Sequence, residues 1–209
     1  MSILKQTLEK LPQSKGCVVI LSGGLDSTIT MRMCVEKYGH ENVHAITFNY
    51  GQRQQFEIEQ AKKSTSILGV SHEVIDLEFL SKIGKGFSCN VDYDIDMARL
   101  EDVSKRHNPI TYVPNRNTIM LSIAAALCEV KGVEYIMAGF QYVARINYLF
   151  FENRDIQVKV IAPFVDLSKA QELQCLLELD GHIQFVKNTI TCYNPSEDGI
   201  SCGECPSCL

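Results

Sequence analysis

Short apolar runs alternate along this chain with longer segments of helical spacing, and this alternation most constrains the fold. The first run, CVVIL at residues 17–21, is apolar throughout, as expected for a strand that is buried on both faces. Three further runs predict strands, at residues 43–48, 72–77 and 134–140. Four segments that each end near a glycine predict helices, at residues 26–38, 54–68, 117–131 and 168–179. The alternation predicts an α/β fold with a doubly wound parallel sheet of about five strands.

Length and charge limit the kinds of protein that the chain can be. Its 209 residues allow one sizeable domain, or a domain with a small appendage. The net charge of -5 argues against a broad nucleic-acid face. The N-terminal stretch lacks the apolar run of a signal peptide, and no apolar run is long enough to span a bilayer. These features predict a cytoplasmic protein without a membrane partner, whose cysteines are thiols or metal ligands.

The stretch SGGLDST, residues 22–28, lies between the first expected strand and the helix that follows it. In an open parallel sheet, ligands bind beyond the carboxyl ends of the strands. Glycines let backbone N–H groups turn toward an anion, and the helix adds its own N–H groups and the positive end of its dipole. The hydroxyl groups of Ser22, Ser27 and Thr28 can donate to phosphate oxygens. The stretch therefore predicts an anion cradle; the alternative is a tight turn in which Asp26 or Ser27 only caps the helix.

Two common phosphate-binding patterns are absent from this stretch, which contains neither GxxxxGK[ST] nor GxGxxG. It resembles instead the SGGxDS loop, or PP-loop, of the ATP pyrophosphatases, which cleave ATP to AMP and pyrophosphate. This resemblance implies a fold of the adenine nucleotide alpha-hydrolase type. It also implies that the pyrophosphate end of ATP is held by Ser22, Gly23, Gly24, Asp26, Ser27 and Thr28. The loop alone names a superfamily and no substrate.

Four of the nine cysteines crowd the end of the chain, at Cys192, Cys202, Cys205 and Cys208. Two overlapping CxxC pairs place three thiolates on one turn, and Cys192 arrives from a short loop. Four thiolates at this spacing suit a tetrahedral structural zinc ion. An iron–sulfur cluster is the alternative, because thiolates are soft ligands. The pattern predicts a small zinc-binding element at residues 186–209, packed on a domain at residues 1–185.

Further segments extend the resemblance to one family, the 7-cyano-7-deazaguanine synthases of queuosine biosynthesis. FNYGQRQQFEIEQA at residues 48–61 is similar to the family's F-x-Y-G-Q-R-x-x-x-E, and TYVPNRN at 111–117 to its T-(F/Y)-V-P-x-R-N. IAPFVDLSKAQ at 161–171 is similar to T-P-L-x-x-x-x-K-A-E, and TITCYN followed by CGECPSC to the zinc-binding end. These motifs, in this order, are specific to the family and run through most of the chain.

The resemblance implies an ATP-dependent carbon–nitrogen ligase with ATP, Mg²⁺ and Zn²⁺ as cofactors. A 7-deazaguanine carboxylate is adenylated, ammonia displaces AMP to give the amide, and a second ATP drives dehydration to 7-cyano-7-deazaguanine. Asp26, Arg116 and Lys169 are the expected catalytic residues, with Asp26 as a Mg²⁺ or cradle residue. Arg53 joins Arg116 and Lys169 as a cation around the phosphates, and solvated surface charge is the alternative for these three. Gly139, at the end of the fourth expected strand, completes the expected nucleotide-binding set.

The resemblance breaks after residue 140. The family continues there with a stretch of the type E-x-D-x-S-G-Y-P-D-C-R, expected to contact the deazaguanine, whereas this chain reads QYVARINYLFFENRD. Candidates for replacing those contacts are Tyr148, Phe151, Glu152 and Asp155, and an apolar core segment is the alternative.

Several activities are compatible with this departure. The enzyme makes the same nitrile in a redesigned pocket, or it stops at the amide or transfers the deazaguanine to another amine, including one on a macromolecule. Alternatively, it is a non-catalytic nucleotide-binding subunit of a larger assembly. A tRNA-thiolating or tRNA-lysidine-type pyrophosphatase is a more distant alternative. The expected partners are a small deazapurine carboxylate and ammonia, and a homodimer is a further expectation.

Overall fold

The structure is a computed structural model, and it describes residues 2–50, 55–82, 115–139, 147, 156–179, 185, 187, 189–192, 196 and 200–203. Every statement below about the structure concerns these residues. Residues 83–114 and most of 140–155, including the rewritten segment after residue 140, lie outside them. Among the described residues, no helix combines the length and the apolar character needed to cross a membrane.

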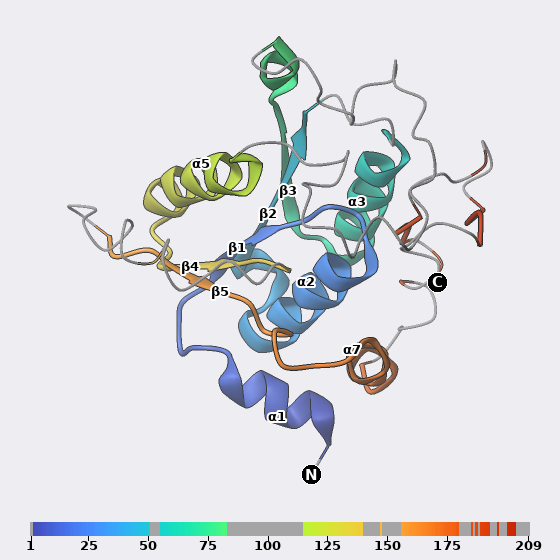
Figure 1. The fold of residues 1–209 in the computed structure, drawn as a ribbon. Coiled ribbons are helices and arrows are strands. Elements are labelled where there is room, and N and C mark those ends of the chain that lie inside the picture. The colour runs from blue at the N-terminus through green and yellow to red at the C-terminus, as the bar shows by residue number, and fades with distance from the viewer. Residues whose placement is uncertain are drawn as a thin grey trace, which may run out of the picture.

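Five parallel strands form one sheet, which confirms the predicted α/β class (Figure 1). The strands are β1 (Cys17–Ile20), β2 (Val43–Asn49), β3 (Ser71–Asp76), β4 (Tyr135–Met137) and β5 (Lys159–Ile161). Their order across the sheet is β3-β2-β1-β4-β5, and every neighbouring pair is parallel. The register pairs Val18 with His44 of β2 on one side and with Ile136 of β4 on the other. Strand β1, the first in the sequence, is therefore the central strand of the sheet.

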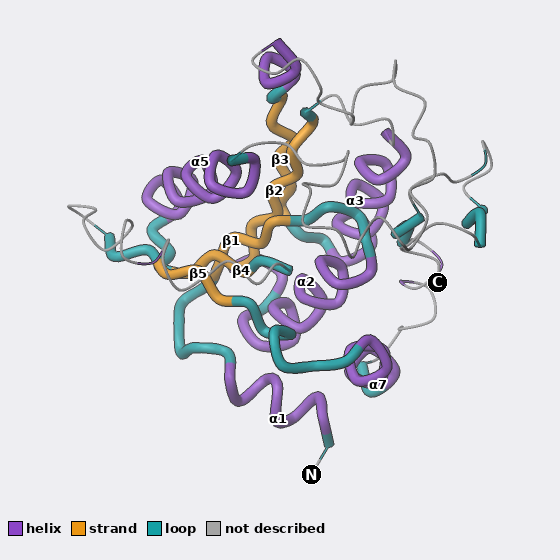
Figure 2. The backbone as a smooth tube through the Cα atoms, in the orientation of Figure 1, coloured by secondary structure: helices purple, strands orange, loops and turns teal. Residues whose placement is uncertain are grey.

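Helices cover both faces of the sheet (Figure 2). The helices are α1 (Ile3–Lys10), α2 (Leu25–Tyr38), α3 (Gln55–Leu68), α5 (Arg116–Lys131) and α7 (Lys169–Leu177), with 3-10 turns at His40–Asn42 and Glu78–Lys82. Helix α5 packs on one face, while α1, α2, α3 and α7 lie on the other. Because the polar N–H and C=O groups of the strands are paired within the sheet, both of its faces can be apolar.

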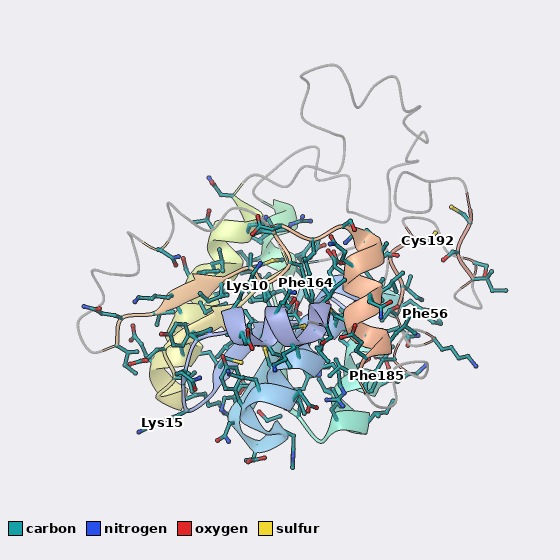
Figure 3. All side chains as sticks on the ribbon, turned by 90° about the horizontal axis from the view of Figure 1, so that it is seen from below. Lys10, Lys15, Phe56, Phe164, Phe185 and Cys192 are labelled. Carbon is teal, nitrogen blue, oxygen red and sulfur yellow. The ribbon has the colours of Figure 1, made fainter. Side chains whose placement is uncertain are left out.

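Strand β1 shows how the sequence builds two cores. Its residues are all buried, and successive side chains point to opposite faces of the sheet. Cys17 and Val19 join the core beneath α1, α2 and α7, which also contains Phe164 and Phe185 (Figure 3). Val18 and Ile20 join the core beneath α5. An uninterrupted apolar run is therefore required at this central position.

The structure adds two elements that the sequence patterns did not predict. Helix α1 is short, and its apolar side chains Ile3, Leu4 and Leu8 are only partly buried against the neighbouring core. Strand β5 has three residues and lies at the sheet edge, so its apolar pattern is too short to stand out. The predicted strand at 134–140 and helix at 168–179 are both shorter in the structure, which ends them at Met137 and Leu177.

The order of the strands creates a crevice at the carboxyl end of β1. From β1 the chain moves outward through α2 to β2 and through α3 to β3. It then returns across β1 by way of α5 to form β4 and β5 on the other side. Helix α2, which follows β1, and helix α5, which precedes β4, therefore lie on opposite faces of the sheet. Ligands of doubly wound sheets bind at such a switch point.

Candidate functional site

A cavity opens at this switch point, beyond the ends of β1 and β2. Six of the residues predicted from the sequence line it: Ser22, Gly24, Asp26, Ser27, Arg116 and Gly139. Its apolar wall includes Ile20, Leu21, Phe48 and Met120. The cavity therefore combines an apolar side with a polar loop at the start of a helix, which is the usual composition of a small-molecule site.

The glycine turn needs glycine at its second position. Gly23 has φ +85°, a conformation that other residues rarely adopt. A Cβ atom at Gly23 would lie 2.1 Å from the backbone oxygen of Glu57, in the first turn of α3. The loop is therefore packed directly against α3. Gly24 is the N-cap of α2, and within the described residues no side chain caps it, so Asp26 and Ser27 are not simple helix caps.

The two serines hold the loop closed through their hydroxyl groups. The Ser22 N–H donates to Ser27 Oγ at 3.1 Å, and Ser27 Oγ donates to the Gly24 carbonyl at 3.1 Å. The two hydroxyl oxygens are 3.0 Å apart, and the Gly24 N–H donates to Ser22 Oγ at 3.3 Å. Since Ser27 uses its proton on the Gly24 carbonyl, the Ser22 hydroxyl is the donor in the contact between the two serines, and it can reach a ligand only by giving up that bond.

The structure does not bring Thr28 into the cavity. Its side chain is fully buried, and Thr28 Oγ1 donates to the Gly24 carbonyl at 2.9 Å. That hydrogen bond stabilises the first turn of α2 and leaves no proton for a phosphate. Gly139 lies close to the same turn: a Cβ atom there would be 3.7 Å from Asp26 Cβ and 3.9 Å from the Ser27 nitrogen. A larger side chain at position 139 would crowd the cradle.

Asp26, Lys169 and Glu172 form a charged cluster at the rim of the loop. The Lys169 ammonium donates to Asp26 Oδ2 and, at 3.2 Å, to Glu172 Oε2. Partial burial opposes the charge on Lys169, but the two carboxylates outweigh it and raise the pKa of its ammonium. Burial, followed by contact with Asp26, raises the pKa of Glu172 to about 7. The structure thus brings the two predicted residues Asp26 and Lys169 together, although 143 positions separate them.

Arg116 lies at the opposite wall of the cavity. Its predecessor Asn115 is the N-cap of α5 and takes the left-handed conformation with φ 55°. Arg116 Nη1 donates to the Tyr50 hydroxyl at 3.3 Å, and Arg116 Cζ lies 5.2 Å from the centre of the Tyr50 ring. At this distance the guanidinium is attracted to the face of the ring. The arginine is therefore held at the cavity wall rather than extended into solvent.

Glu57 faces the same wall. From the sequence, Glu57 either pairs with Arg53 or is a solvated helix charge. In the structure it lines the cavity, and burial raises its pKa to about 7, although the charge of Arg116 opposes the shift. Glu57 is therefore not a solvated charge. Arg53 lies outside the described residues.

The C-terminal segment reaches the glycine turn. The Ile190 N–H donates to the Gly23 carbonyl at 3.3 Å, and Thr191 lines the cavity. Cys192 is fully buried, and the Cys202 N–H donates to Cys192 Sγ at 3.2 Å. The structure thus brings these two predicted ligands together. The described residues hold no group of three or more candidate metal ligands; Cys205 and Cys208 lie outside them.

The polar residues of the site that were not predicted include Tyr50, Glu172 and Thr191, together with Thr47, Glu57 and Asn117. Tyr50 belongs to the quoted YGQR segment, so its position beside that motif was a usable signal. Thr191 likewise belongs to the quoted TITCYN segment. Glu172 carries no signal of its own, because only the packing of α7 brings it to the loop.

Solved structures confirm the fold. An NH3-dependent NAD synthetase from Campylobacter jejuni has a TM-score of 0.55 and 18% identity, over 88% of this chain and 75% of that one. An NMN synthetase from Francisella tularensis has a TM-score of 0.60 and 14% identity, over 98% of this chain and 78% of that one. At such low identity, the likeness concerns the fold alone.

Sequence comparisons are more specific. The family model described as "Queuosine biosynthesis protein QueC" matches residues 16–209. A 7-cyano-7-deazaguanine synthase from Oceanobacillus iheyensis is 39% identical over 93% of this chain and 90% of its own length. A protein of the same name from Desulfatibacillum aliphaticivorans is 35% identical, over 94% and 90% respectively. The chain therefore belongs to the QueC family of queuosine biosynthesis proteins.

Proposed function

We propose that the chain is an ATP-dependent ligase that makes 7-cyano-7-deazaguanine. It adenylates a 7-deazaguanine carboxylate, couples it to ammonia to give the amide, and uses a second ATP to form the nitrile. The observation that carries the proposal is the cavity at the switch point, with a glycine turn on one side and Arg116 on the other. The names of the relatives, 7-cyano-7-deazaguanine synthase, support the product.

The cavity has polar groups that suit the triphosphate of ATP and apolar side chains that suit its adenine ring. The N–H groups in the first turn of α2 have no carbonyl partner within the helix, so they and the Ser22 hydroxyl can donate to phosphate oxygens. Arg116 and Lys169 add positive charge near this end. The apolar side chains of Ile20, Phe48 and Met120 can pack against the adenine ring. Arg53 stays a proposed phosphate ligand from the sequence.

Adenylation solves a chemical problem of the acceptor. A carboxylate oxygen is a poor leaving group, and so the carboxylate attacks the α-phosphorus of ATP and releases pyrophosphate. Ammonia then attacks the activated carbonyl carbon, and AMP leaves. Negative charge builds up when pyrophosphate leaves and again when AMP leaves. The cations and N–H donors of the cradle stabilise this charge. The same activation of the amide oxygen, followed by loss of AMP, gives the nitrile.

Asp26 suits a magnesium ion that accompanies ATP. Carboxylate oxygens are the ligands that Mg²⁺ prefers, and Asp26 Oδ1 is buried without a hydrogen-bond partner in the described part of the chain. Bound Mg²⁺ would neutralise charge on the departing pyrophosphate. The Lys169 ammonium, which donates to Asp26 Oδ2 in this structure, would then donate to the phosphates.

Cys192 and Cys202 suit the proposed structural zinc. A backbone N–H that donates to a cysteine sulfur stabilises a thiolate, the form that binds metal. With Cys205 and Cys208, the set would be closed and tetrahedral, without an open position for catalysis. We accordingly propose residues 186–209 as a zinc-binding element on a domain at residues 1–185.

One incubation tests the activity. The protein is mixed with ATP, Mg²⁺, ammonium and 7-carboxy-7-deazaguanine, and the products are analysed by mass spectrometry. Nitrile with two AMP per product is expected. Amide alone would show that the reaction stops early, and AMP without a small product would point to another amine, including one on a macromolecule. Absence of both AMP and nucleotide binding would leave a non-catalytic subunit. A cytoplasmic location and a homodimer stay predictions.

The loop variant is the control for this incubation. Asp26→Ala combined with Ser27→Ala removes the carboxylate and the hydroxyl that closes the loop, so AMP formation is expected to disappear. The matched control is Glu129→Gln, an exposed glutamate on α5 that should leave turnover unchanged. Unchanged AMP formation in the double variant would contradict the assignment of residues 22–28. Release of ADP in place of AMP would indicate a different chemistry.

A further inference from the structure

Thr47 is a buried polar residue beside the apolar part of the cavity wall. It is 1% exposed and lies in β2, directly before Phe48. Thr47, Phe48 and Leu21 all line the cavity. The mechanism proposed above gives Thr47 no role. The hydrogen bonds of its hydroxyl group therefore decide which ligand group this part of the wall can bind.

The proton of the Thr47 hydroxyl is committed to the protein backbone. Thr47 Oγ1 donates to the Leu21 carbonyl at 2.7 Å. Leu21 follows the last residue of β1 and is 1% exposed, so bulk water cannot supply a replacement donor. Leaving a buried carbonyl without a donor is costly. The Thr47 proton therefore stays with Leu21 and does not point to a ligand.

His72, in β3, holds the Thr47 hydroxyl from the other side. His72 Nε2 lies 2.8 Å from Thr47 Oγ1, and His72 Nδ1 lies 3.2 Å from the Thr65 hydroxyl of α3. Burial, and then the charge of Lys62, lowers the pKa of His72, so the ring carries a single proton at neutral pH. Because Thr47 has given its proton to Leu21, the ring proton is on Nε2 and is donated to Thr47. Nδ1 then accepts from Thr65.

These bonds leave the Thr47 hydroxyl with acceptor capacity alone. A threonine hydroxyl has one proton and two lone pairs. In Thr47 the proton goes to Leu21 and one lone pair accepts from His72, and the hydroxyl has no further partner among the described residues. Since Thr47 and Leu21 both line the cavity, a ligand that packs there can reach the remaining lone pair. The ligand group that binds it must be a hydrogen-bond donor.

We propose that Thr47, oriented by His72, is a specificity-determining residue that accepts a hydrogen bond from the 6-amino group of adenine. The proposal rests on the proposed function for ATP as the ligand. In ATP this amino group is the only donor of the adenine ring. Hypoxanthine and guanine carry a carbonyl oxygen at the same position, and its lone pairs would face the lone pair of Thr47. The residue therefore selects ATP over ITP and GTP.

The first test compares two nucleotides that differ only in this amino group. ATP and purine riboside 5′-triphosphate share the ribose and the triphosphate, so effects on the phosphate cradle cancel in the ratio of their affinities. In titration calorimetry, the native chain should bind ATP about tenfold more tightly. Thr47→Val keeps the shape of the side chain but removes the acceptor, so the ratio should fall to about one. A native ratio near one, or a native-like ratio in Thr47→Val, would overturn the proposal.

The second test asks whether His72 sets the direction of the hydroxyl, and its probe is ITP. In His72→Leu the Thr47 hydroxyl can turn and donate to the carbonyl of ITP. The preference for ATP over ITP should therefore fall at least about threefold, while the preference over purine riboside triphosphate is kept. In His72→Gln the amide N–H can replace Nε2–H, so the native preference should return. A native preference for ATP over ITP in His72→Leu would refute the role of His72.

Nitrogen NMR provides a readout that needs no nucleotide. At about pH 7.5 the ring signals of His72 should report a neutral imidazole with its proton on Nε2. A proton on Nδ1 would contradict the inference, because Thr47 would then donate to the ring. If Thr47→Val does not fold, this spectrum and the affinity ratio of the native chain decide the matter.

Thr7→Val is the matched control for Thr47→Val. Thr7 is 2% exposed, and its hydroxyl donates to the Ile3 carbonyl in α1 at 2.8 Å, away from the cavity. This variant should lose stability but keep both nucleotide ratios. If the native chain binds none of the three nucleotides, the proposed function fails and this inference fails with it. If it binds ATP and purine riboside triphosphate equally well, the proposed function stands and only this inference fails.

Discussion

Glu57 places an acidic group at a cavity wall where water is partly excluded. Burial raises its pKa from 4.5 to about 7, so the folded state holds the proton more tightly than the unfolded state does. As the pH rises from 4.5 to 7, the unfolded chain releases its proton first, and the free energy of unfolding falls. Glu57→Gln should therefore be more stable than the native chain at about pH 8, by up to about 3 kcal/mol.

At about pH 4 the same variant should match the native chain, because both states then carry a neutral side chain. Urea unfolding at the two pH values measures the difference. Glu129→Gln, exposed on α5, should show no such change with pH. An equal effect of Glu57→Gln at both pH values would contradict the burial of this carboxyl.

Gly23 is constrained both by its backbone conformation and by its close packing. Gly132 is constrained by its conformation alone, so the two glycines allow the two effects to be compared. Both Gly23, with φ +85°, and Gly132, with φ +67°, require the left-handed region. A Cβ at Gly23 would lie 2.1 Å from the Glu57 oxygen, whereas no atom lies within 4 Å of one at Gly132. Gly132→Ala should therefore cost only about 1–2 kcal/mol of stability, the price of the backbone conformation.

Gly23→Ala should cost more than Gly132→Ala, because α3 must also move away from the loop. It should abolish ATP binding, whereas Gly132→Ala should leave it intact. Thermal unfolding and isothermal titration with ATP measure the two effects. Equal losses of stability in the two variants would show that the loop is not packed against α3 as the structure places it.

At the scale of elements, the sequence predicted what local patterns encode. The buried run of β1 and the helices that end at Gly39, Gly69 and Gly132 all match the structure within a few residues. Helix α1 and strand β5 were missed because both are short and gain their stability from neighbours. The PP-loop could be recognised because its chemistry is contiguous. Glu172 could not, since only the packing of α7 on α2 makes it part of the site.

The capping box of α7 gives a prediction at this scale. The Gln171 N–H donates to Ser168 Oγ at 3.4 Å, and Ser168 N–H donates to Gln171 Oε1 at 2.9 Å. Ser168→Ala should cost about 1 kcal/mol of stability and also weaken ATP binding, because the next residue is Lys169. Ser2→Ala removes the matching cap of α1, where Ser2 Oγ accepts from the Lys5 N–H at 3.1 Å. That control should lose similar stability but keep its affinity, as measured by urea unfolding and titration calorimetry.

At the scale of the whole molecule, the C-terminal segment contacts the PP-loop. The C-terminal segment pairs with the loop through the Ile190 N–H and the Gly23 carbonyl, and Thr191 borders Gly24. Cys192 follows directly and is fully buried. A metal at this cysteine would therefore fix the backbone that forms one wall of the nucleotide cavity. The proposed zinc would be structural in its chemistry, and its position would couple it to the cradle.

The last prediction tests this coupling. Protein purified without added metal should contain one zinc ion per chain, measured by elemental analysis, and Cys205→Ser should lower zinc content and melting temperature together. Nucleotide affinity should fall by at least about fivefold, because the 189–192 segment loses its anchor. Cys128→Ser is the control: this core thiol is buried away from the tail, so its loss should reduce stability without reducing zinc. Iron with visible absorbance would contradict the assignment of zinc. Loss of zinc with unchanged nucleotide affinity would mean that the tail and the PP-loop act independently.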